Sequence, residues 1–482
     1  MTCRMTLIAD EFVKRFTLAG SFLALACLLS ACRPTSPDNL PNADQFASTI
    51  RTAAADPCLL VLAPHQGDGK VDREIVRLQQ QVRGARDPNP WLERLGWTFV
   101  AKARRTFDPG FYKLAEQCAL CISSREPESN EALLLRGHIL HNLHRFKAAE
   151  PLARALVVKR GLALDFGLLG DVLMEQGRLK EAADAYQTML DLKPSLHSYS
   201  RAAQLRWLKG DLTGAIEAMQ LAVAAGSPQD AESAAWVNTR LAFYQFQAGD
   251  NDAARRTDDI ALTYQHNYAP ALLLRGRMKL SEGETDDAVA QLQSATRLSP
   301  LPEYQWVLAE ALRKAGRESE ALSIEQLLAQ TGAANDPRTY ALYLATRGQL
   351  PQIAIRLAES ELKERADVFT HDALAWSFAA AGRIDDALPQ LEGALAEGTH
   401  DARLFFHAAV IHAKAGHTEE ASHFVNLATE LMRLLLPSER EQLQLVARAV
   451  DHELAQRPGP AMGPTAFNKT GHRSPEEEQT NR

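Results

Sequence analysis

Residues 166–194 read FGLLGDVLMEQGRLKEAADAYQTMLDLKP and contain the pattern that decides the fold. The apolar residues before Gly177 recur with a period of 3.6, which predicts a helix, and a second amphipathic stretch follows. Gly177 stands at the expected end of the first helix, where a residue that accepts a positive φ is favoured. Ala182, in the second helix, is small enough for the two helix backbones to approach. The stretch therefore predicts two antiparallel helices joined by a glycine turn.

The same spacing recurs through most of the chain. Successive turn glycines lie 32 to 39 residues apart, at Gly177, Gly210, Gly249, Gly283, Gly316, Gly348, Gly382 and Gly416. Five residues after each glycine comes an alanine, at positions 182, 215, 254, 288, 321, 387 and 421, except that Ile353 follows Gly348 with Ala354 beside it. A period of this length indicates one helical hairpin repeated many times.

The repeat resembles the tetratricopeptide repeat, a helical hairpin with the pattern W-x2-L-G-x2-Y, then A-x3-F, then P. The copy quoted above carries the pattern at Phe166, Leu169, Gly170, Leu173, Ala182, Tyr186 and Pro194. A second copy carries it at Leu272, Gly276, Ala288, Leu292 and Pro300, with Arg275 and Lys279 departing from it. A degenerate copy spans 130–159 with His144 in the turn position. The resemblance implies an all-α fold, a right-handed α-solenoid of about ten hairpins.

The resemblance also suggests where the array begins and ends. We expect it to span residues 91–436, preceded by an N-terminal cap segment at 56–90. Stacked repeats need polar terminal caps, and the amphipathic residues of 437–456 are expected to form a capping helix. Residues 457–482 lack apolar periodicity and are expected to be a disordered tail.

The N-terminus has the features of an export signal. Lys14 and Arg15 precede an apolar run of 14 residues, Phe16 to Leu29, which is too short to span a bilayer. The run ends in Leu-Ser-Ala-Cys at 29–32, which resembles the bacterial lipobox. We therefore interpret 1–31 as a lipoprotein signal peptide, Cys32 as the lipidated residue and 32–55 as a flexible tether. An ordinary signal peptide cut near Ala31 is the alternative.

This interpretation locates the protein in the cell envelope, anchored to a membrane by lipid. Arg33 follows Cys32, and the absence of an aspartate there resembles outer-membrane lipoproteins. In a diderm organism the expected location is the outer membrane, facing the periplasm.

Composition and motifs exclude several function classes. The chain has 482 residues, with 53 Lys and Arg against 60 Asp and Glu, so its net charge of −7 disfavours nucleic acid as a partner. The sequence contains none of the strings G-x-S-x-G, H-E-x-x-H, G-x-G-x-x-G or Walker A. We expect no enzyme activity and no cofactor.

Cysteine and histidine clusters offer one alternative function. Export implies an oxidising compartment, so Cys58 is expected to form a disulfide with Cys118 or Cys121, with buried free thiols as the alternative. Two histidine sets occur, His138, His141 and His144, and then His407, His412, His417 and His423. They are interpreted as surface histidines without a metal, because a site needs three or four converging ligands. A periplasmic metal- or redox-handling protein remains the alternative.

In the resembled family the first helix of each hairpin lines a concave groove that binds polypeptide. The corresponding residues here are His138, His141, Asp171, Gln204, Trp207, Phe243, Phe246, Arg277, Trp306, Glu310, Arg313 and Trp376. Five are aromatic, and aromatic side chains are typical interface anchors. The sequence thus predicts a non-catalytic scaffold or adaptor that binds a peptide or a folded envelope subunit. The alternative is that some of these residues pack between repeats.

Overall fold

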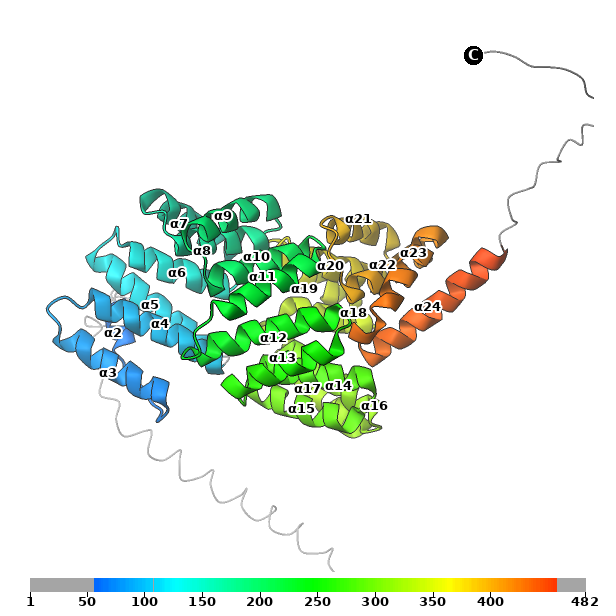
Figure 1. The fold of residues 1–482 in the computed structure, drawn as a ribbon, viewed down its shortest axis with the longest axis horizontal. Helices are drawn as coiled ribbons and strands as arrows, with labels where there is room; N and C mark the ends of the chain where they lie inside the picture. Colours follow the sequence, from blue (N-terminus) through cyan, green and yellow to red (C-terminus); the bar gives the residue numbers. More distant parts are fainter. Residues whose placement is uncertain (1–55, 107, 457–482) are drawn as a thin grey trace, which may run out of the picture. The chain divides into compact units, whose positions relative to one another are not determined.

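The computed structural model describes residues 56–106 and 108–456. The predicted signal peptide, Cys32, the tether and the predicted disordered tail lie outside these residues. Within them every regular element is helical, and ten helical hairpins stack in chain order (Figure 1). The prediction of an all-α solenoid of about ten hairpins is confirmed.

The first five hairpins are α4 (Asn89–Thr106) with α5 (Gly110–Arg125), α6 (Asn130–Asn142) with α7 (Phe146–Lys159), α8 (Ala163–Glu175) with α9 (Leu179–Leu192), α10 (Leu196–Leu208) with α11 (Leu212–Ala224), and α12 (Ala231–Gln247) with α13 (Asn251–Tyr264). The second five are α14 (Ala269–Glu282) with α15 (Thr285–Leu298), α16 (Pro302–Lys314) with α17 (Glu318–Asn335), α18 (Pro337–Thr346) with α19 (Pro351–Leu362), α20 (Val368–Ala380) with α21 (Ile384–Leu395), and α22 (Ala402–Ala415) with α23 (Thr418–Glu430). Before them come α2 (Pro57–Val61) and α3 (Lys70–Gly84), and after them the short helix η1 (Met432–Leu434) and α24 (Pro437–Gln456). No helix among the described residues is both long and apolar enough to cross a membrane.

Turn geometry follows the glycine pattern. All eight turn glycines have a positive φ, between 62° and 84°, and His144 takes the same conformation at 56° in the degenerate copy. The alanines five residues later are fully buried between the paired helices. After Gly348 the buried residue is Ala354, not Ile353. Here α19 starts one residue later than its counterparts because Leu350, with φ 45°, lengthens the turn.

The second half of the array packs against the first half. The turns that follow α8, α10 and α12 contact the loops that follow α19, α21 and α23. Thr399 donates a hydrogen bond of 2.5 Å to the Leu208 carbonyl, and Arg365 pairs with Glu175 at 2.9 Å. Lys209 and Glu397 form an ion pair across the same contact. We call this contact the seam. It determines which inner surfaces of the array are open.

Candidate functional site

Four of the five aromatic residues expected to line an accessible groove are buried by the chain itself. Trp207, Phe246, Trp306 and Trp376 are at most 5% exposed. Phe369 of α20 stacks on Trp207 with ring centroids 5.6 Å apart. Arg403 of α22 lies 4.7 Å from the Trp306 ring centroid. The expectation of an exposed aromatic stripe therefore needs correction, because later helices fill the space in front of these rings.

The segment 431–440, which we call the C-terminal strap, occupies part of the predicted groove. Arg277 donates to the Leu434 carbonyl at 3.0 Å. Glu310 accepts hydrogen bonds from the hydroxyl of Ser438 at 2.8 Å and from its amide at 3.1 Å. The side chains of Leu435 and Leu436 are buried in the main core. Two predicted groove residues thus bind a polypeptide segment, but the segment belongs to this chain.

Charged groups hold the strap in place. Arg403 donates to Glu439 at 2.7 Å, and Arg433 donates to the Phe246 carbonyl at 3.0 Å. Burial raises the pKa of Glu439, but the Arg403 charge outweighs this effect and the pKa lies below its usual range. Burial raises the pKa of Glu310 above its usual range despite the hydrogen bonds from Ser438.

The remaining predicted residues are held by polar partners or ring contacts. Arg201 pairs with Asp171 at 2.6 Å, and Tyr244 donates to Gln204 at 3.0 Å. Burial raises the pKa of Asp171, but the charge of Arg201 outweighs it, so this pKa is lowered. The further contacts are Arg104 with His138 at 2.9 Å, His141 against the Phe146 ring, Phe243 against Trp207, and Arg313 with Glu325 at 2.6 Å.

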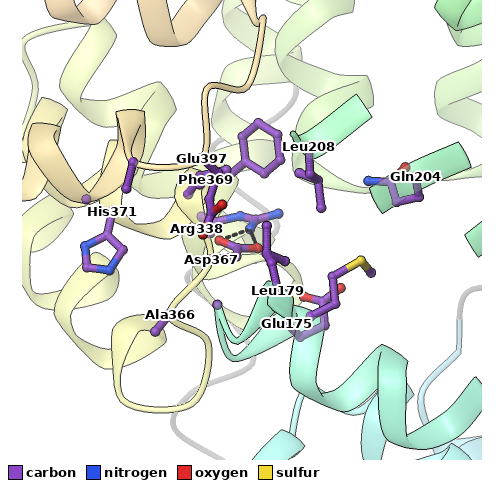
Figure 2. A pocket seen from close by; sticks show the side chains of 15 residues that line it. Glu175, Leu179, Gln204, Leu208, Arg338, Ala366, Asp367, Phe369, His371 and Glu397 are labelled. Atoms are coloured by element: carbon purple, nitrogen blue, oxygen red, sulfur yellow. Dashed lines mark hydrogen bonds and ion pairs between the residues drawn. The ribbon is translucent and has the colours of Figure 1, made fainter. Parts of the chain in front are cut away.

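A cavity of about 340 Å³, the seam pocket, lies between the two halves of the array. Its walls are built from α8 to α10 on one side and from α18 to α21 on the other, and Gln204 is the one predicted residue that lines it. Figure 2 shows the paired side chains of Arg338 and Asp367 in this pocket, joined at 2.8 Å. Asp367 also caps α20 by accepting from the Thr370 amide at 2.7 Å.

The carboxylates that line the seam pocket are balanced by cations. Burial raises the pKa of Asp367, but the positive charges of Arg338 and Arg365 outweigh it and lower the pKa overall. Leu179, Leu208 and Phe369 add apolar surface beside this ion pair. Glu175 and Glu397 also line the pocket and pair with Arg365 and Lys209, which lie outside its lining. The pocket is therefore suited to hold a side chain or small group, because each of its carboxylates is already paired with a cation.

A second, more open cavity of about 420 Å³ lies beside the last helix, and we call it the α24 groove. It is lined by Ala345, Thr346, Arg347, Gly348, Trp376, Ala380, Val410, Lys414, Gln442, Leu445 and Val446. Trp376 is the predicted residue found here. Sequence reasoning missed Leu445, although a signal exists. Leu443 and Val450, seven residues apart, form the buried face of α24. Leu445 lies outside that face, and 60% of its surface is exposed.

The cysteines and histidines lie at separate places. Cys58 and Cys121 form a disulfide that joins α2 to α5, while Cys118 is a buried free thiol whose pKa is raised by burial. His144 stacks on Phe146, and His412 and His417 face each other at 3.3 Å. The interpretation as surface histidines is wrong for His407, which is fully buried and bonds Asp372 at 2.8 Å. His423 packs against Phe424. Residues 56–106 and 108–456 contain no group of three or more His, Cys, Asp or Glu placed to hold a metal ion.

Three segments of the chain match the tetratricopeptide repeat family model, at residues 168–231, 273–337 and 373–426. No curated protein matches the chain. The solved structures similar to it include yeast Tom70, with 14% identity, a TM-score of 0.34 and coverage of 86% of this chain and 96% of that chain. They also include Pseudomonas aeruginosa pilF, with 19% identity, a TM-score of 0.34 and coverage of 46% and 97%. A tetratricopeptide repeat protein from Parabacteroides merdae has 16% identity, a TM-score of 0.31 and coverage of 54% and 100%. Scores this low carry no inference about function.

Proposed function

We propose that this chain is a tetratricopeptide-repeat protein and acts as a non-catalytic scaffold or adaptor that binds a polypeptide partner in assembly or secretion at a bacterial envelope. The three segments that match the tetratricopeptide repeat family model support this proposal. The observation that carries the proposal is the stack of ten hairpins among the described residues, in which the seam pocket and the α24 groove lie between elements distant in sequence. Such cavities can take side chains of a partner, and a few anchored side chains supply most of the binding free energy of an interface.

The surfaces that remain open support a location for the proposed partner. Much of the predicted groove is filled by the C-terminal strap and by α20 and α22, so a partner must use the parts that remain open. The seam pocket and the α24 groove include two of the twelve residues predicted from the sequence, Gln204 and Trp376. We therefore place the partner surface at these two cavities.

The proposal includes anchoring by lipid at Cys32, on the periplasmic face of the outer membrane. Support comes from the Leu-Ser-Ala-Cys sequence at 29–32 after a short apolar run, and from Arg33 at the following position. Two or more acyl chains anchor a protein stably, whereas one chain binds reversibly.

One experiment tests the anchor and the scaffold separately. The full chain and the Cys32→Ala variant are expressed in a diderm host with labelled palmitate, and proteins that co-purify with each are identified. We expect label and membrane association in the wild type only, and the same partner protein with both chains. Label on the variant, or none on the wild type, would contradict the anchor. Recovery of neither chain with a protein partner would contradict the scaffold.

A further inference from the structure

We propose that the α24 groove is the docking surface for a partner segment that carries an apolar side chain next to a carboxylate. The inference rests on the proposed scaffold function and adds the location and the chemistry of the partner. Three features of the groove carry it: a rigid apolar floor, an exposed leucine on its wall, and two cations. Among the described residues Lys414 has no carboxylate partner, and Arg347 shares Glu325 with Arg313.

Trp376 forms a fixed apolar floor, and 5% of its surface is exposed. Its indole N–H donates to the Thr346 hydroxyl at 3.0 Å, and its ring stacks on His407 with centroids 4.1 Å apart. His407 is itself held by Asp372 at 2.8 Å. Because these contacts already fix the indole ring, Trp376 loses little conformational entropy when a side chain of a partner packs on it. Ala380, Val410 and Val446 extend the apolar surface.

Leu445 lies on the wall of the groove and is not needed to hold α24 in place. The helix is attached through Leu443 and Val450, which are buried, and through the strap before it. Leu445 leaves 60% of its surface exposed. An exposed leucine alone is common on protein surfaces, but this one borders a cavity of about 420 Å³, within the usual range for ligand pockets.

Both charged residues that line the groove are cations. The carboxylate nearest to Arg347 is that of Glu325 at 3.8 Å, and Glu325 already accepts a hydrogen bond of 2.6 Å from Arg313. Arg347 Nε is buried and has no hydrogen-bond partner. Lys414 donates to the Ala379 carbonyl at 3.2 Å, which is a neutral acceptor.

The charge of the groove selects the partner. The whole chain has a net charge of −7, yet no carboxylate lines this cavity. A carboxylate of the partner would gain charge-assisted hydrogen bonds from Arg347 and Lys414. Its apolar neighbour would pack mainly against Leu445 and Val446, and against the small exposed part of Trp376. A basic segment would meet two like charges and is excluded on the same ground.

The test places a photoreactive benzoylphenylalanine at Leu445 of the full chain in its native envelope. After irradiation the adduct is mapped by mass spectrometry to a peptide. We expect an adduct with another protein, at a segment in which Asp or Glu lies within two residues of an apolar residue. The same amino acid at Leu322, which is also exposed but lies on α17, is the matched control and should not give this adduct.

Charge-removing variants complete the test. Lys414→Gln, alone and together with Arg347→Gln, should reduce the yield of the adduct, by roughly tenfold for the double variant, which corresponds to one decade in affinity. A thermal melt close to that of the wild type shows that the fold is retained. Lys414→Gln alone changes an exposed residue, so its adduct yield still tests the proposal if the double variant unfolds.

Four outcomes would overturn the proposal. They are an adduct with residues 457–482 of this chain, an adduct with a second copy, no adduct, and an adduct that the charge variants leave unchanged. If a partner protein co-purifies but Leu445 gives no adduct, the scaffold function stands and this groove is not its docking surface. If no protein co-purifies, both proposals fail.

Discussion

Gly210 and Gly398 meet backbone to backbone across the seam, so that a Cβ on Gly210 would lie 2.5 Å from the Gly398 carbonyl oxygen. Gly210 ends the turn after α10, and Gly398 precedes α22 in the second half of the array. Three of the eight turn glycines, Gly177, Gly210 and Gly249, face distant parts of the chain in this way, whereas the other five face open space. The glycine turn therefore has two roles here: it permits a positive φ in every hairpin, and it permits close packing at the seam.

These two roles can be separated by alanine substitution. Gly283→Ala should cost about 1 kcal/mol of unfolding free energy, since φ is 83° and the new Cβ meets nothing. Gly210→Ala has a similar φ of 78° but adds the clash with Gly398, which should cost a further 1–3 kcal/mol or so. Urea denaturation of both variants measures the difference. Equal losses in the two variants would mean that the seam is not packed as described.

The strap depends on the hydrogen bonds of Glu310. Ser438→Ala removes the hydroxyl donor from a carboxylate that is 3% exposed, which should lower the unfolding free energy by about 1–3 kcal/mol. Hydrogen exchange should increase in the strap and at the start of α24. Ser323→Ala is the control, because that hydroxyl is exposed and bonds only within α17. If Ser438→Ala changes neither the unfolding free energy nor the hydrogen exchange of the strap, then the strap is not the buried element described here.

Acid should destabilise the protein partly through His138. Burial, and then the charge of Arg104, lowers the pKa of His138 from 6.5 to about 3. In the unfolded chain His138 binds its proton at a higher pH than in the folded chain. The contribution of neutral His138 to the free energy of unfolding is therefore complete above pH 6.5 and is lost as the pH falls toward 3. His138→Gln should remove a slope of up to about 1.4 kcal/mol per pH unit.

The measurement is a set of denaturation curves between pH 5 and pH 7, a window above the titration of ordinary carboxylates. His266→Gln, at an exposed position, controls for the loss of an imidazole as such. An unchanged slope in His138→Gln would show that His138 is solvated in the folded protein.

Local features of the fold could be predicted from the sequence because each hairpin is encoded within about 34 residues. The positive φ of Gly177 recurs at seven further turn glycines, and the burial of Ala182 recurs at the same spacing in six further copies. The shift from Ile353 to Ala354 needed the structure, since it depends on the conformation of Leu350.

The candidate site could be predicted only in part. Trp207 and Trp306 occupy the inner positions of their repeats, yet residues far along the chain, Phe369 and Arg403, cover them. Such coverage depends on how the repeats curve and on where the last helix packs, and neither is encoded in a single repeat. Trp306→Ala should therefore unfold the protein rather than expose a binding defect, at a cost of about 3–5 kcal/mol. The seam pocket and the α24 groove could not be predicted from the sequence, because their lining residues are far apart along the chain.

The packing of the two halves against each other is the central structural claim, because it decides which surfaces a partner can reach. Zero-length carbodiimide coupling tests it most directly, since the reagent joins a lysine to a carboxylate only where they already pair. In dilute monomeric protein we expect a covalent link between Lys209 and Glu397, 188 residues apart in sequence, with a yield like that of the local pair Lys279 and Glu284. Formation of the local link without the Lys209–Glu397 link would contradict the packing of the two halves at the seam.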